Sequence, residues 1–128
     1  MRRSEDGAAV VDFVLVSVLL VSLFLIVMQV GVVLHVRNVL VASAAEGARY
    51  GANADRTPEE GADRAKQVIA EALGQRVADS MSCVPVAGEE VDGQPVVDVR
   101  CTGPMPIVFL PTGAFSLTVH GHAIEESR

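Results

Sequence analysis

Few residues of this 128-residue chain have the chemical types that catalysis needs. Its three histidines are His35, His120 and His122, and no G-x-S-x-G nucleophile motif occurs. The sequence also lacks a G-x-x-x-x-G-K-[ST] phosphate loop and a dinucleotide-binding fingerprint. We therefore expect a protein that is not an enzyme and needs no cofactor.

Two groups of side chains raise the question of a metal ion. His120 and His122 flank Gly121, so both could point to one face of a strand, with Glu125 as a third ligand. Structural zinc sites use four ligands, so two histidines on the solvent face of an edge strand are the favoured interpretation. A second group, Glu89, Glu90 and Asp92, lacks the ligand spacing of known calcium loops. No metal site is predicted.

The two cysteines, Cys83 and Cys101, are too far apart in sequence for C-x-x-C chemistry. An isolated pair of this kind fits one disulfide in an oxidising compartment. We therefore expect the part of the protein that contains this disulfide to lie outside the cytoplasm.

Asp12 stands at the threshold of an apolar run from Phe13 to Leu34. As a helix, this run is about 33 Å long, enough to cross the hydrocarbon core of a membrane. The carboxylate has two interpretations. The positive end of the helix dipole stabilises an acid there in any protein, whereas an ionisable residue at a membrane span is a functional candidate. Position alone slightly favours the first.

The apolar run is longer than the core of a cleavable secretory signal, although Ala42-Ser43-Ala44 imitates a cleavage site beyond it. Arg2 and Arg3 precede the run and Arg37 follows it, which modestly favours a cytoplasmic N-terminus. We expect a single-pass protein of the cell (inner) membrane with an extracytoplasmic C-terminal head. Past Leu34 the acids outnumber the bases, which argues against nucleic acid or anionic lipid as the partner of the head.

The helix is expected to continue beyond the membrane, because residues 35–51 contain no proline and are rich in alanine. Residues 1–7 would then be a short leader and 8–52 one transmembrane and extended helix. Gly47 and Gly51 lie four residues apart. They either permit the close approach of another helix or loosen and cap the helix end. The two interpretations carry equal weight.

The predicted fold class is α+β, with residues 53–128 as a small extracytoplasmic head. Thr57, Pro58 and Glu60 predict the start of a helix with a capping box. That helix ends at Gly74 or continues to Asp79, and its predicted buried stripe consists of Ala62, Ala65, Ile69, Ala72 and Leu73. About three antiparallel strands follow, at 82–86, 96–101 and 115–124, with the prolines of 103–113 expected to prevent a regular ladder there.

Two segments of the chain resemble a known family. Gly7, followed by Ala8-Ala9-Val10-Val11 and then Asp12-Phe13, is similar to the processing sites of type IV prepilins, where a peptidase cuts after glycine and a carboxylate occupies the fifth mature position. Glu46-Gly47-Ala48-Arg49-Tyr50 resembles the signature of TadE-like proteins, minor pseudopilins of the tight-adherence (Flp) system. The usual glutamate of that branch is an aspartate in this chain.

The resemblance implies a processing site at Gly7 and Ala8, an assembly carboxylate at Asp12 beside Phe13, and a pilus-assembly role. Expected partners are other pilin or pseudopilin subunits, a prepilin peptidase, the membrane platform of the pilus machinery and the lipid bilayer. The alternative is an unprocessed single-pass membrane protein whose extracytoplasmic head binds a partner or ligand. A membrane-anchored metal-binding or hydrolytic domain is a third, weaker alternative.

Overall fold

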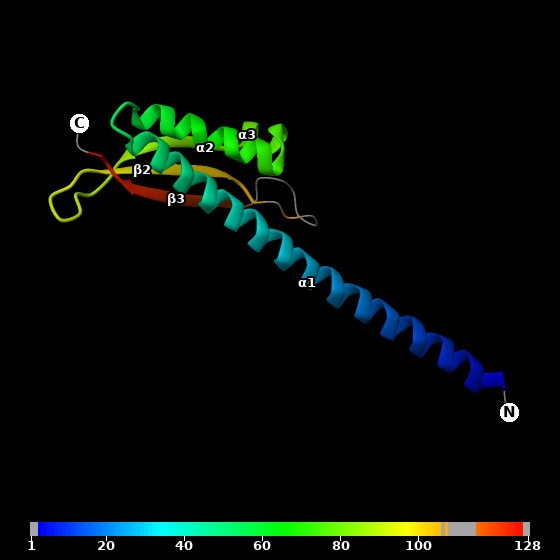
Figure 1. Ribbon diagram of the computed structural model, residues 1–128. Coiled ribbons are helices and arrows are strands. Elements are labelled where there is room, and N and C mark those ends of the chain that lie inside the picture. The colour runs from blue at the N-terminus through cyan, green and yellow to red at the C-terminus, as the bar shows by residue number, and fades with distance from the viewer. Residues whose placement is uncertain (1–2, 106, 108–114, 127–128) are drawn as a thin grey trace. The chain divides into compact units, whose positions relative to one another are not determined.

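The computed structural model describes residues 3–105, 107 and 115–126, with only the backbone of residues 3–6 (Figure 1). The fold is α+β, as predicted. Its elements in chain order are α1 (Arg3–Ala52), α2 (Pro58–Leu73), α3 (Gln75–Ser80), β1 (Ser82–Ala87), β2 (Val96–Pro104) and β3 (Ser116–Ile124). The short α3 exists as a separate helix because Gly74 adopts a φ of +94°, which interrupts the helical path after Leu73.

Helix α1 takes part in two separate units, which meet between Val32 and Val33. In the first unit its large apolar side chains are exposed along the whole run from Val10 onward. Among the described residues, this is one helix long and apolar enough to span a membrane, and an 18-residue window within it has a mean hydropathy of 3.0. Such a surface is unstable in water and requires lipid or protein around it.

The second unit is a small globular head whose core includes the outer part of α1. Leu40, Ala44 and Ala48 of this helix are fully buried against the head. The buried hydroxyl of Ser43 donates to the carbonyl of Val39 within α1, so it leaves no unpaired polar group at this contact. The predicted continuation of the helix beyond the apolar run is therefore part of the packed core.

Helix α2 begins with the predicted capping box. Thr57 accepts a hydrogen bond from the Glu60 amide, and the Glu60 carboxylate accepts one from the Thr57 amide at 2.9 Å. Ala62, Ala65 and Ile69 are buried, as expected from the apolar stripe. The prediction for Ala72 was wrong: it is exposed, because at this end of α2 the neighbouring Leu73 is the side chain that packs against the core.

The three strands form one antiparallel sheet in the order β1-β2-β3. The expected break of the ladder at Gly103 was wrong, because β2 continues to Pro104, which pairs with Ser116. β1 pairs with β2 only as far as Thr102, so Pro104 has a neighbouring strand on one side alone. Its missing amide hydrogen therefore leaves no second strand unpaired. The remaining predicted loop, at 106 and 108–114, lies outside the described residues.

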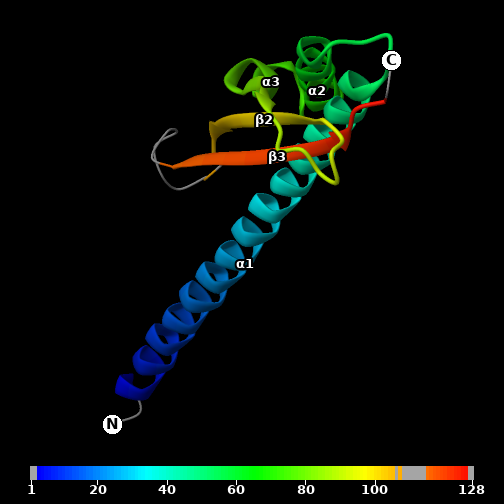
Figure 2. The same ribbon diagram turned by 90° about the vertical axis from the view of Figure 1, so that its left-hand side faces the viewer.

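The head is layered, with helices on one face of the sheet. Val99 and Cys101 of β2 and Val119 of β3 point toward the helices and are buried. A Cβ atom on Gly121 would collide with the backbone of Ala44 and Ala45, so α1 crosses β3 in direct contact at this glycine. Figure 2 shows the sheet beside the outer part of α1, with α2 near β2.

Candidate functional site

Gly7, Ala8 and Asp12 lie on consecutive turns near the start of α1. A side chain added at Gly7 would meet no atom within 4 Å, and Ala8 is exposed. Within the described residues, no other segment of the chain therefore packs over the bond that is expected to be cut.

The Asp12 carboxylate is exposed, and the neighbouring Phe13 ring is 72% exposed. Within the described residues no side chain forms an ion pair with Asp12. On the same helix, apolar side chains such as Leu15, Leu19 and Leu23 are also exposed. An acid on a surface of this kind needs a cationic or hydrogen-bonding partner wherever the surface enters lipid.

The segment Glu46–Tyr50 has a packing role in the head. A Cβ on Gly47 would lie 2.5 Å from the Gly61 carbonyl oxygen and 2.7 Å from Ala65 Cβ, and one on Gly61 would lie 2.6 Å from the Gly47 carbonyl. These two glycines thus bring α1 and α2 into backbone contact. Of the two interpretations of Gly47, close helix approach is confirmed. Gly51 also contacts Gly61, and α1 continues through it to Ala52.

Gly61 was not predicted from the sequence as the partner of Gly47. The available signal was a glycine in the middle of an otherwise favourable helix, where it costs about 1 kcal/mol relative to alanine. Such a residue often has a packing reason.

The other signature side chains differ in their exposure. Ala48 is fully buried, whereas Arg49 is exposed and Glu46 and Tyr50 are half-buried. The Arg56 guanidinium lies 4.9 Å from the centre of the Tyr50 ring, a cation–π contact that joins the end of α1 to the start of α2. The signature therefore combines an internal contact with an exposed polar rim.

The two predicted edge-strand histidines do lie on the open face of the sheet. His120 Nδ1 and His122 Nδ1 are 3.4 Å and 3.6 Å from Asp98 Oδ2 of the neighbouring strand. Asp98 is only 9% exposed, and within the described residues its Oδ1 atom has no hydrogen-bond partner. The sequence analysis paired these histidines with Glu125 and missed Asp98, since only the β2–β3 register places it opposite His122.

His120, His122 and Asp98 form a small polar cluster. In the part of the chain that the structure describes, no three His, Cys, Asp or Glu side chains are placed to hold a metal ion. The imidazoles instead surround the carboxylate, and the rings of His120 and His122 stack at 6.2 Å. The cluster places polar groups in the middle of the open sheet face.

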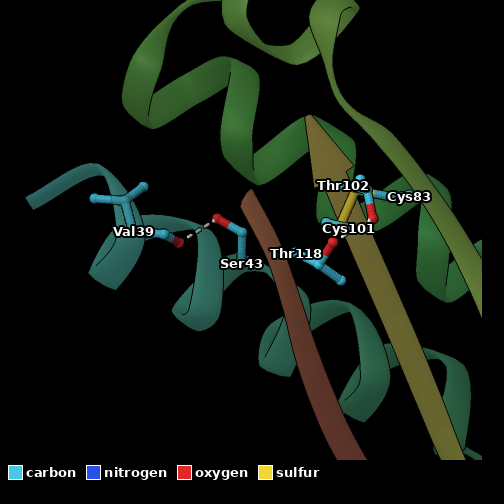
Figure 3. Close-up of a disulfide and its surroundings, with 6 residues drawn as sticks. All are labelled: Val39, Ser43, Cys83, Cys101, Thr102 and Thr118. Atoms are coloured by element: carbon cyan, nitrogen blue, oxygen red, sulfur yellow. Dashed lines mark hydrogen bonds between the residues drawn. A yellow bond between two sulfur atoms is a disulfide. The ribbon is translucent and has the colours of Figure 1, made fainter. Parts of the chain in front are cut away.

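The predicted Cys83–Cys101 disulfide is confirmed. It joins directly opposed residues of β1 and β2, with Cα atoms 4.1 Å apart (Figure 3). Cys101 is fully buried, so the bond forms part of the core between the sheet and the helices. A buried disulfide of this kind is consistent with an extracytoplasmic head.

These features define a class of protein: a membrane-length N-terminal helix that continues into a small, disulfide-linked α+β head. Within this class, residues 7–49 match the family model described as TadE-like protein. The resemblance found in the sequence is thus confirmed over the part of α1 that carries Gly7, Asp12 and most of the signature. No curated protein and no solved structure matches the chain.

Proposed function

We propose that this protein is a minor pseudopilin-like membrane protein that contributes to the assembly of a tight-adherence type IV pilus or a related secretion apparatus. The observation that carries the proposal is the exposed apolar surface of α1, with Asp12 at its start, inside the TadE-like match. A non-enzymatic role fits a chain whose chemically distinctive residues lie on a packing helix.

The proposed mechanism begins with insertion of α1 into the inner membrane, with a cytoplasmic N-terminus and an extracytoplasmic head. The basic residues before the apolar run and the buried disulfide both support this orientation. A prepilin peptidase then cuts between Gly7 and Ala8, which leaves a positive amine on Ala8. The membrane platform of the pilus machinery would receive the processed subunit.

Asp12 supplies the assembly contact in this proposal. An acid at the centre of a membrane helix costs about 2.5–3.5 kcal/mol on insertion scales, which is an upper bound for Asp12 at the start of the apolar run. Pairing the Asp12 carboxylate with the Ala8 amine of a neighbouring pilin or pseudopilin offsets the cost of both charges. The exposed apolar side chains of α1 would exchange lipid contacts for contacts with the neighbouring helices.

The experiment is co-expression of the full chain with a prepilin peptidase, followed by mass spectrometry of its N-terminus. We expect a mature chain that begins at Ala8, and the Gly7→Leu variant is expected to remain uncut. The Ser4→Ala variant, altered in the leader but not at the bond, is the matched control and should be processed normally. A wild-type chain that keeps its leader would instead favour an unprocessed membrane protein with a partner-binding head.

A further inference from the structure

The β2–β3 end of the head carries exposed apolar side chains. Beyond the last strand pair, Pro104 and Ser116, the Met105 amide donates to the Phe115 carbonyl at 2.9 Å, which continues the hairpin by one residue. Phe115 is 55% exposed, and Met105 and Ile107 are partly exposed. Three apolar side chains therefore reach the surface at this end of the sheet.

Charged residues are distributed unevenly along the strands of the head. No Asp, Glu, Lys or Arg occurs in the sequence between Arg100 and Glu125. The β1–β2 connection, at the other end of the sheet, carries Glu89, Glu90 and Asp92, all exposed. The strands and their connections are thus uncharged at the β2–β3 end and acidic at the β1–β2 end, while α3, whose last residue lies against Gly103, carries the exposed Arg76 and Asp79.

The packing against α1 shows which end of the sheet lies toward the lower-numbered residues of the outer part of α1. β3 contacts α1 at Gly121 beside Ala44, and the Glu126 amide donates to the Ala52 carbonyl, so β3 and the outer part of α1 run in the same direction. The five residue steps from Gly121 to Glu126 of the chain therefore lie alongside the eight residue steps from Ala44 to Ala52 of α1. At the same ratio, the six residue steps from Gly121 back to Phe115 correspond to about ten residues of α1. Counted back from Ala44, this places Phe115 near the level of Leu34.

Leu34 is the last residue of the apolar run, and Arg37 follows soon after. Figures 1 and 2 both show β3 starting at the end of the sheet that faces the lower-numbered residues of the outer part of α1. In the proposed membrane orientation, the Phe115 end of the head therefore lies at the level where the apolar run of α1 ends.

We propose that the side chains of Met105, Ile107 and Phe115 form a second membrane contact by entering the lipid interface. The inference rests on the proposed membrane insertion of α1. Apolar and aromatic side chains at this depth enter the headgroup and acyl boundary by about 5–10 Å. Because these three side chains are uncharged, the contact depends on apolar burial and does not require anionic lipid.

The contact would fix the tilt and rotation of the head. A single helix leaves the head free to turn about the helix axis, whereas interfacial anchors restrict that rotation. The acidic β1–β2 connection and the open sheet face with His120 and His122 would then point in a defined direction away from the bilayer.

The chain contains no tryptophan, so single tryptophans serve as depth probes. The full chain is reconstituted into phosphatidylcholine vesicles with bromine on the acyl chains at different depths. Phe115→Trp is the test variant, Phe24→Trp reports insertion of α1, and Val91→Trp, an exposed apolar position on the β1–β2 connection, is the matched control. Ile107→Trp provides a second probe of the same contact, and circular dichroism checks each fold.

We expect blue-shifted, bromine-quenched emission from Phe115→Trp, at a shallower depth than Phe24→Trp, unchanged by added salt, with Val91→Trp unquenched. Quenching of Phe24→Trp with no quenching of either Phe115→Trp or Ile107→Trp would overturn the inference and leave the membrane span intact. Equal quenching of Val91→Trp and Phe115→Trp would overturn it as well, because the head would then lie on the bilayer without the proposed direction. If Phe24→Trp is not quenched, the membrane span fails, and the proposed function fails with it.

Discussion

At the scale of single residues, Gly47 is the position where the identity of the side chain matters most for packing. We predict that Gly47→Ala destabilises the head by about 1–3 kcal/mol, because the added methyl group overlaps the Gly61 carbonyl and the Ala65 side chain. Urea unfolding of the detergent-solubilised chain, monitored by circular dichroism, measures the loss.

The matched control for Gly47 is Gly31→Ala, on the same helix. A Cβ at Gly31 meets nothing within 4 Å, so the same substitution should leave the stability of the head unchanged. Equal midpoints for Gly47→Ala and wild type would show that the two helices can separate without loss, and would contradict the backbone contact.

The same residues show the limit of sequence reasoning. The spacing of Gly47 and Gly51 indicated a possible close approach, but a pattern on one helix does not identify the surface that approaches it. Gly61 and Gly121 each meet α1 through tertiary packing, over separations that no local rule covers. Asp98 was missed for the same reason, since strand register alone brings it to the histidines.

At the scale of elements, the start of α2 was predictable because all of its contacts are local. We predict that Thr57→Ala costs about 1 kcal/mol of stability, since the Glu60 amide loses its acceptor. Thr57→Ser keeps the hydroxyl and should cost much less. Thermal unfolding of the full chain in detergent measures both.

The capping box also predicts coupling between its two members. Glu60→Ala removes the acceptor for the Thr57 amide, so the double variant should lose less stability than the sum of the two single variants. Strictly additive losses in this cycle would mean that the two hydrogen bonds act independently and that the reciprocal cap contributes nothing of its own.

Strand lengths were harder to predict than the helix start. The alternating residues of 96–101 indicated the middle of β2 correctly, but the prolines near its end suggested an early stop. β2 continues to Pro104 because β1 ends first and leaves one side of that residue unpaired. Such a condition depends on where another strand stops, which the sequence of β2 does not contain.

At the scale of the whole molecule, the structural division falls inside α1. The sequence analysis placed the head at 53–128, where the composition changes, whereas the packed unit begins at Val33. Amino-acid composition reflects whether a segment is surrounded by lipid, water or protein. The outer part of α1 consists largely of helix-forming and small residues, which suit burial against the head. Leu40, Ala44 and Ala48 therefore belong energetically to the head.

This division predicts the behaviour of fragments. A fragment of residues 36–128 should be soluble and unfold cooperatively, because it retains the α1 surface that covers Gly61 and Gly121. A fragment of residues 53–128 should lack cooperative unfolding. It loses the buried Leu40 side chain, whose removal from a core alone costs about 2–5 kcal/mol out of a total stability of about 5–15 kcal/mol. Circular dichroism melts and the dispersion of amide proton resonances distinguish the two.

Adding a synthetic peptide of residues 36–52 to the shorter fragment should restore the dispersed spectrum, whereas the same peptide with Gly47→Ala should restore it less. A dispersed spectrum and a cooperative melt from 53–128 alone would show that the head is complete without α1.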